Sequence, residues 1–218
     1  TWFRTGGCTD IFCIVYDETE LEIILNNLDK KIPIFVIGVG SNVLIRDGGF
    51  RGIIIKLGKS FNKLIIENDL IHAGSSILDS NISKFASLNL LQGLEFFSGI
   101  PGSIGGAVKM NAGCYGGETR NVLKEVLIMK RNGEKKILSN NELEFSYRFS
   151  NLSENDIILS AIFKGNYGEK DEIEKKILEI KSIRENSQPI KTKTGGSTFK
   201  NPKLNYAAKL IEEADCKG

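Results

Sequence analysis

Two glycine-rich segments carry residues that could bind a phosphate group through the protein backbone. The first is Gly38-Val39-Gly40-Ser41-Asn42, which follows an apolar run with strand character. Glycine permits turns in which successive backbone N–H groups point toward one anion, and Ser41 and Asn42 add side-chain donors. Taken alone, the segment is explained better as a plain hairpin turn.

The second segment is Ile100–Ala107, which continues into Asn111-Ala112-Gly113. The surrounding stretch 93–117 holds eight glycines in 25 residues. Small residues at so many positions pack poorly as core, and the entropy lost in ordering them needs an offset such as a ligand laid against the backbone. Interleaved apolar residues such as Phe96 and Val108 would anchor the segment, which argues against a mobile linker. We therefore interpret it as a ligand-binding segment.

Two better-known nucleotide motifs are excluded at these positions. A dinucleotide fingerprint at Gly38 would need glycine at position 43 and a helix after it, but Val43 is followed by strand-like residues. Gly58-Lys59-Ser60 resembles the end of a P-loop, whose first glycine would fall at position 53, where the chain has Ile53.

Hydrophobic periodicity predicts mixed strands and helices around these segments. The predicted strands are Ile11–Tyr16, Ile34–Ile37, Val43–Ile45, Gly52–Leu57, Leu64–Glu67, Leu70–Ala73, Val126–Lys130, Lys135–Leu138 and Ile157–Lys164. One predicted helix begins at Asp17, and three others cover Ile77–Leu91, Glu169–Arg184 and Ala207–Ala214. A loop is predicted over 188–196. Strands and helices do not alternate regularly, so a parallel Rossmann sheet fits poorly. We expect an α+β protein with lobes at residues 1–60 and 61–165, and a third lobe starting within 166–218.

Composition excludes several classes of partner. The 218 residues carry 29 basic and 27 acidic side chains, so the net charge of +2 offers no field to attract nucleic acid or a membrane surface. The apolar runs are too short to cross a bilayer, and the chain opens without a signal peptide. Four scattered cysteines and a single histidine make no zinc motif, so we expect no metal site. We expect these cysteines to be reduced and buried in a cytoplasmic protein.

Several ordered motifs together resemble the UDP-N-acetylenolpyruvoylglucosamine reductase (MurB) family. They comprise the two glycine-rich segments, extended to Phe50 and to Gly113, and four shorter runs. The shorter runs are Thr1-Trp2-Phe3-Arg4-Thr5-Gly6-Gly7, Tyr147-Arg148-Phe149-Ser150, Gly196-Ser197-Thr198-Phe199-Lys200-Asn201-Pro202 and Leu210-Ile211-Glu212-Glu213-Ala214. The similarity runs from end to end in the right order.

The resemblance implies a fold of the vanillyl-alcohol-oxidase (PCMH) type, in which two lobes hold FAD and a third binds substrate. It implies that NADPH reduces the flavin, which then reduces the enolpyruvyl ether of UDP-N-acetylglucosamine to UDP-N-acetylmuramate in peptidoglycan precursor synthesis. The absence of a tyrosine-bearing insertion resembles the shorter subtype of the family. We expect a monomer whose partners are these small molecules.

The resemblance also implies residue roles. Arg148 matches the cation that polarises the substrate carboxylate, and Ser197 matches the proton donor. Tyr147, Lys200 and Asn201 match substrate contacts. The residues that match the FAD site are Gly38, Val39, Gly40, Ser41, Asn42, Pro101, Gly102, Ser103, Gly105, Gly106, Ala107, Asn111, Ala112 and Gly113. A serine hydroxyl is a poor acid without help, so Arg148 or Lys200 is expected near Ser197.

The chain departs from the family pattern in ways that leave alternatives open. The family's third catalytic residue, a glutamate, lies well beyond the motif with which this chain ends, so we expect negligible turnover from these residues alone. Val39 and Asp215 stand where the family has smaller residues, and Asp215 would take a left-handed helix-ending conformation. Alternatives are another PCMH-type flavin oxidoreductase, in which Cys8 or Cys13 would carry the flavin covalently, and a non-catalytic flavin-binding remnant.

Overall fold

The computed structural model describes residues 1–188 and 196–216, so the predicted loop over 188–196 lies almost entirely outside the described residues. The strands are β1 (Thr9–Val15), β2 (Ile34–Val36), β3 (Phe50–Leu57), β4 (Leu64–Glu67), β5 (Leu70–Gly74), β6 (Leu91–Gln92), β7 (Gly113–Cys114), β8 (Gly117–Glu118), β9 (Leu123–Met129), β10 (Lys135–Ser139), β11 (Ile157–Lys164) and β12 (Asn166–Tyr167). The α-helices are α1 (Glu18–Asn27), α2 (Asp79–Leu88), α3 (Ile104–Lys109), α4 (Lys170–Ser187) and α5 (Ala207–Glu213). Short 3-10 helices are η1 (Lys59–Phe61), η2 (Glu95–Gly99), η3 (Thr119–Asn121) and η4 (Asn140–Leu143).

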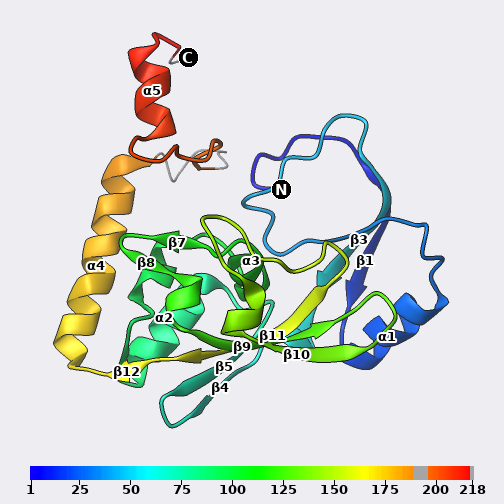
Figure 1. Ribbon diagram of the computed structural model, residues 1–218, viewed down its shortest axis with the longest axis horizontal. Coiled ribbons are helices and arrows are strands. Elements are labelled where there is room, and N and C mark those ends of the chain that lie inside the picture. The colour runs from blue at the N-terminus through cyan, green and yellow to red at the C-terminus, as the bar shows by residue number, and fades with distance from the viewer. Residues whose placement is uncertain (189–195, 217–218) are drawn as a thin grey trace.

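The N-terminal part forms a three-stranded parallel sheet with β3 between β1 and β2 (Figure 1). Helix α1 begins where the sequence predicts, because the Asp17 side chain accepts a hydrogen bond from the Glu20 backbone N–H at 2.9 Å and so caps the helix. Leu21 and Leu25 are buried, and they fix this helix against the sheet.

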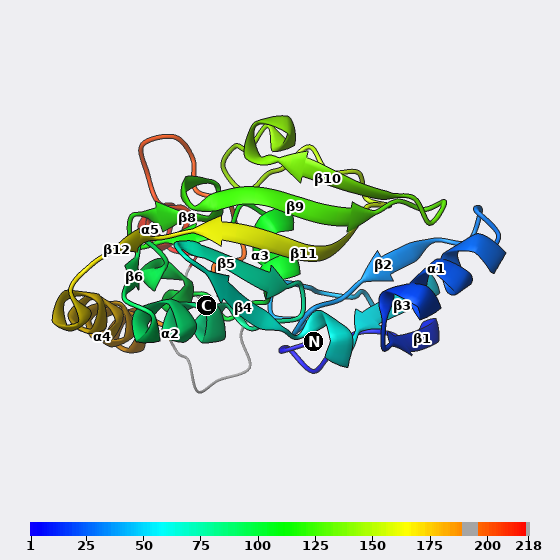
Figure 2. The same cartoon turned by 90° about the horizontal axis from the view of Figure 1, so that it is seen from below.

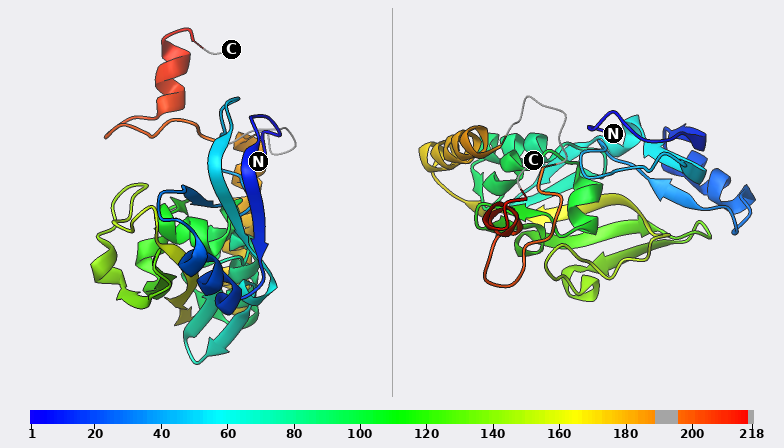
Figure 3. Two further views of the ribbon diagram at one scale, coloured as in Figure 1. Left: turned by 90° about the vertical axis from the view of Figure 1, so that its right-hand side faces the viewer. Right: turned by 90° about the horizontal axis from the view of Figure 1, so that it is seen from above.

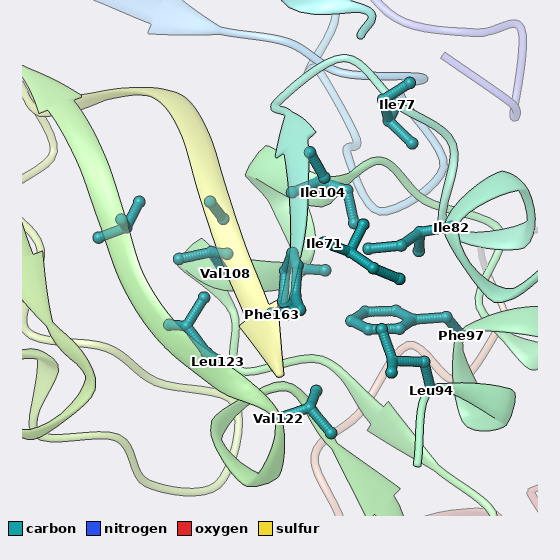
Figure 4. Close-up of a cluster of buried hydrophobic side chains, with 14 of the residues drawn as sticks. Ile71, Ile77, Ile82, Leu94, Phe97, Ile104, Val108, Val122, Leu123 and Phe163 are labelled. Carbon is teal, nitrogen blue, oxygen red and sulfur yellow. The ribbon is translucent and has the colours of Figure 1, made fainter. Parts of the chain in front are cut away.

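The middle of the chain forms a five-stranded antiparallel sheet in the order β10-β9-β11-β5-β4 (Figure 2). The predicted hairpin is present between β4 and β5, and its turn residue Asn68 has a φ of 56°, a conformation that asparagine tolerates well. Helices α2 and α3 cover one face, where Ile71, Phe97 and Phe163 are fully buried in the main core (Figure 4).

A second buried cluster joins the two sheets. Met129, Ile157 and Leu159 belong to the five-stranded sheet, yet they pack in one cluster with Val15 and Ile55 of the parallel sheet. The two lobes therefore share part of their core, although the lobe boundaries at residues 60 and 165 stay predictions.

The structure corrects three expectations. Val43–Ile45 is not a strand: it has no ladder partner, and Leu44 is exposed. The neighbouring Arg46 carbonyl instead accepts hydrogen bonds from Gly7 N–H at 3.0 Å and Gly49 N–H at 2.9 Å.

The predicted helix 77–91 is shorter, because Leu90 turns left-handed with a φ of 58° and the chain then pairs as β6. The four cysteines are free, but Cys8 and Cys216 are exposed rather than buried, because both lie in surface segments outside the core clusters.

Helix α3 lies inside the glycine-rich stretch and was not predicted, because glycine disfavours helix interiors. By contrast, Asp215 has the expected left-handed conformation, with a φ of 57° just after α5. Helix α5 buries none of its residues and projects from the body of the molecule (Figure 3). None of the helices among the described residues is long and apolar enough to cross a membrane.

Candidate FAD and substrate site

The loop at residues 38–42 presents unused backbone donors. Ile37 N–H donates to the Ile55 carbonyl at 2.9 Å, so the loop leaves the end of the parallel sheet in a fixed direction. Trp2 N–H donates to the Gly40 carbonyl at 3.0 Å, which ties the loop to the N-terminal segment. The backbone N–H groups of residues 38–42 donate to no acceptor in the described part of the chain. Successive free amides of this kind can form an anion-binding nest.

The second glycine-rich segment is held by backbone hydrogen bonds from behind. Asp79 N–H donates to the Gly102 carbonyl at 3.1 Å, Ile104 N–H to the Ile77 carbonyl at 2.9 Å, and Gly105 N–H to the Ser75 carbonyl at 2.9 Å. These bonds connect the segment to the beginning of α2 and the end of β5. The N–H groups of Gly102, Ser103 and Gly106 make no hydrogen bond to another described residue, so they remain available to a ligand.

The two segments meet at Gly38 and Ser103. A methyl group added at Gly38 would overlap Ser103 Oγ, so a larger residue at this position would force the Ser103 side chain to shift. Ser103 is 4% exposed and has little room to move away. The two segments with free amides are therefore neighbours, and Ser41 and Pro101, one from each, line the same space, which we call the cleft. A dinucleotide with a charged diphosphate needs an arrangement of this kind. The residues present fit FAD.

A cavity of about 420 Å³ adjoins this cleft and brings four of the predicted residues together. Ser41 and Pro101 line it from the two glycine-rich segments, and Ser197 and Asn201 line it from the C-terminal part. The other described residues that line it are Trp2, Arg184, Ser187, Gln188, Gly196, Thr198, Phe199, Tyr206, Ala207, Ala208 and Ile211. Predicted cofactor and substrate residues thus share one space.

Arg148 and Tyr147 form a second group beside the cavity. Arg148 has a φ of 57°, and its Nη2 donates to the Gly113 carbonyl at 2.9 Å. The guanidinium carbon lies 4.9 Å from the centroid of the Tyr147 ring. Asn201 N–H donates to Tyr147 Oη at 3.3 Å, which connects this group to the cavity. A left-handed arginine is a strained conformation of the kind that functional sites often hold.

Other predicted residues lie away from the cavity lining. Asn111 is fully buried, and its side chain is occupied by Glu118, Ser146 and Arg120. The carbonyl groups of Ala107 and Ala112 accept hydrogen bonds from Thr119 Oγ1. The Lys200 side chain is exposed. Neither Arg148 nor Lys200 lines the cavity that contains Ser197. The cofactor and substrate roles of these residues stay predictions.

Two titratable groups behind the cleft are perturbed by burial. Burial raises the pKa of the Cys114 thiol to about 12, against the opposing charges of Arg148 and Arg184. Burial also raises the pKa of Asp79 well above its usual value; its carboxyl group is fully buried without a hydrogen-bond partner. Within residues 1–188 and 196–216, no group of three or more His, Cys, Asp or Glu side chains is placed to hold a metal ion.

Sequence reasoning missed Arg184 and assigned no role to Trp2 within its motif. Arg184 lies in the last turn of α4, where a cation is ordinary because it complements the helix dipole. No local pattern distinguishes it from the other charges of that helix. Trp2 is the single tryptophan of the chain, and a conspicuous residue at the start of a matched motif was the available signal.

Comparisons with known proteins agree with this geometry. A family model described as an FAD binding domain matches residues 10–139. A UDP-N-acetylenolpyruvoylglucosamine reductase from Caulobacter vibrioides is 47% identical over the whole chain, which covers 73% of that protein. The reductase of the same name from Rickettsia typhi is 44% identical, with 74% of it covered.

Two solved structures resemble this chain. The reductase (MurB) from Thermus caldophilus has a TM-score of 0.84 and 33% identity, over 95% of this chain and 74% of that one. The 6-hydroxy-D-nicotine oxidase from Arthrobacter nicotinovorans has a TM-score of 0.56 at 15% identity, over 75% of this chain and 38% of that one, which shows a shared fold alone. The predicted FAD-binding fold of the vanillyl-alcohol-oxidase type is confirmed. The chain belongs to the UDP-N-acetylenolpyruvoylglucosamine reductase family and carries its FAD binding domain.

Proposed function

We propose that this chain reduces the enolpyruvyl ether of UDP-N-acetylglucosamine to UDP-N-acetylmuramate, with NADPH as reductant, in peptidoglycan precursor synthesis. The observation that supports the proposal is the close approach of Gly38 to Ser103, next to a cavity that Ser41, Pro101, Ser197 and Asn201 line together. The names of the relatives, at 42–47% identity, support the substrate.

The backbone supplies the cofactor site in this proposal. The free N–H groups of residues 38–42, with those of Gly102, Ser103 and Gly106, bind the anionic diphosphate of FAD. FAD held by these amides would supply the hydride chemistry between NADPH and the carbon–carbon double bond. Because the amides are held by backbone hydrogen bonds, they need no reorganisation to stabilise the negative charge.

Side chains supply the proton and the substrate contacts. Ser197 donates the proton to the carbon next to the one that receives hydride, and Arg148 interacts with the substrate carboxylate. Asn201, Tyr147 and Lys200 contact the rest of the UDP-sugar. The bond from Asn201 to Tyr147 Oη supports a common role for these two residues.

The proposal includes the setting of the reaction. We infer a cytoplasmic monomer with small-molecule partners and neither nucleic acid nor membrane, since all four cysteines are free thiols, as is usual in a reducing compartment.

A flavin titration tests the function. The purified protein is titrated with FAD and followed by flavin absorbance and by quenching of Trp2 fluorescence. We expect saturable binding, a change in the flavin spectrum when the enolpyruvyl UDP-sugar is added, and faster flavin reduction by NADPH than by NADH. Protein that stays colourless after dialysis and shows no heat of FAD binding contradicts the proposal.

A further inference from the structure

Arg184 is the only side chain with a permanent charge among the described residues that line the cavity. The other described lining groups are hydroxyls, amides, aromatic rings and aliphatic carbons. A cation among neutral groups attracts an anion to the cavity, and Arg184 is the described lining residue that can do so.

The guanidinium group of Arg184 finds no acceptor among residues 1–188 and 196–216. Its Nε atom is buried without a hydrogen-bond partner, and the side chain forms no ion pair with another described residue. A buried guanidinium N–H without an acceptor is unfavourable. An anionic oxygen in the cavity would remove that cost, and arginine matches carboxylates especially well because its donors form a planar fork.

Helix α4 holds Arg184 in place. Ile180, one turn earlier, is 3% exposed, and a methyl group added at Gly99 of η2 would lie 3.0 Å from it. Lys176 of the same helix pairs at 3.3 Å with Glu95, which is almost fully buried. The guanidinium is therefore presented from a fixed helix.

Arg148, unlike Arg184, already has partners for its guanidinium group. It donates to the Gly113 carbonyl and lies over Tyr147, and it does not line the cavity. Both arginines are close enough to Cys114 to oppose the effect of burial on the pKa of its thiol. The two cations thus lie near the same short segment, but among the described residues only Arg184 meets the space that contains Ser197.

We propose that Arg184 is a specificity-determining residue that binds the carboxylate of the enolpyruvyl group beside Ser197. This inference rests on the proposed function and assigns the carboxylate contact to a second arginine. A carboxylate is favoured over the FAD diphosphate as the anion, because the free amides of the glycine-rich segments already serve the diphosphate. Arg184 shares its cavity with Ser197 and Asn201.

The test compares two ligands that differ in the enolpyruvyl group, which carries the carboxylate. Only a change in their relative affinities that depends on Arg184 counts as evidence. The FAD-loaded protein is titrated with enolpyruvyl UDP-N-acetylglucosamine and with UDP-N-acetylglucosamine, by calorimetry and by the flavin difference spectrum. The variants are Arg184→Met, Arg184→Lys and the matched control Lys181→Met, an exposed position earlier on α4 that does not line the cavity. We expect the unmodified protein to prefer the enolpyruvyl ligand by about tenfold or more, because a charge-assisted bidentate pair forms.

Arg184→Met should abolish that preference, Arg184→Lys should restore part of it, and Lys181→Met should leave it unchanged, while FAD affinity stays within about twofold throughout. A preference that survives Arg184→Met overturns the inference but leaves the proposed function standing. A loss of FAD affinity with the preference intact also overturns the inference, because Arg184 would then bind the FAD diphosphate rather than the carboxylate. Failure of the unmodified protein to bind either UDP-sugar overturns the proposed function together with the inference.

Discussion

The two sides of this cleft use different parts of the chain. The proposed cofactor side consists of backbone amides, and the proposed substrate side consists of exposed side chains. On the cofactor side, backbone amides are fixed by further backbone bonds such as Ile104 N–H to the Ile77 carbonyl, close to a buried core. On the substrate side, Ser197 and Asn201 are exposed side chains, and α5 beside them buries nothing. The first arrangement is rigid before a ligand arrives, whereas the second depends on a few exposed contacts. Mutations should therefore separate FAD binding from substrate binding.

The strongest test of the cofactor side is Gly38→Val. Its side chain would overlap Ser103 and separate the two glycine-rich segments, so we expect FAD affinity to fall by about 100-fold or more. Fluorescence titration with FAD measures this. Gly48→Ala is the matched control, because a methyl group there meets nothing within 4 Å. Adding Ser103→Ala to Gly38→Ala should partly restore FAD affinity. If Gly38→Val binds FAD as tightly as the unmodified protein does, the two glycine-rich segments do not bind FAD together.

Asp79→Asn tests whether the backbone alone holds the cofactor side. Burial raises the pKa of Asp79 in the folded state above its unfolded value, so folding is penalised as pH rises above about 4. We expect the variant to gain about 1–3 kcal/mol of unfolding free energy at pH 8, and the gain should vanish below the unfolded pKa. Urea denaturation at both pH values measures it. FAD affinity should not change; a large loss would give the carboxyl group a direct part in binding.

Tyr147→Phe tests the substrate side. It removes the acceptor of the Asn201 N–H, an exposed bond of 3.3 Å, so we expect affinity for the UDP-sugar to fall about three- to fivefold. Calorimetry on the FAD-loaded protein should show this with FAD affinity unchanged. Parallel losses of both affinities would contradict the separation of the two sides.

The smallest effect is expected from Cys8→Ser and Cys13→Ser. Cys13 packs against the second core cluster, and burial, followed by the charge of Glu20, raises the pKa of its thiol, so it is a poor nucleophile. We expect both variants to bind FAD normally and the denatured unmodified protein to have the mass of the bare polypeptide. A mass increase equal to one FAD would favour a covalent flavin oxidoreductase.

From sequence we could single out the glycine-rich segments and also Ser197 and Asn201, which line the cavity, but not how these residues are brought together. Glycine runs such as Pro101–Gly106 reveal local backbone freedom, so a binding role could be predicted for them before their positions were known, and that role stays a prediction. The contact between Gly38 and Ser103 could not, because no local pattern encodes a long-range approach. The strand predicted at Val43–Ile45 failed for a related reason: aliphatic composition favours a strand, but this segment pairs with no described strand. Arg184 was missed because its cavity exists only in the folded chain.

The shared cluster of Met129, Ile157 and Leu159 with Val15 and Ile55 bears on how the molecule melts. Lobes with separate cores can lose structure one after the other, with an intermediate that keeps only one of them intact. Here neither sheet can come apart without exposing apolar side chains of the other. Heating should therefore produce a single cooperative transition for both sheets, and flavin should be released at the temperature at which the secondary structure is lost.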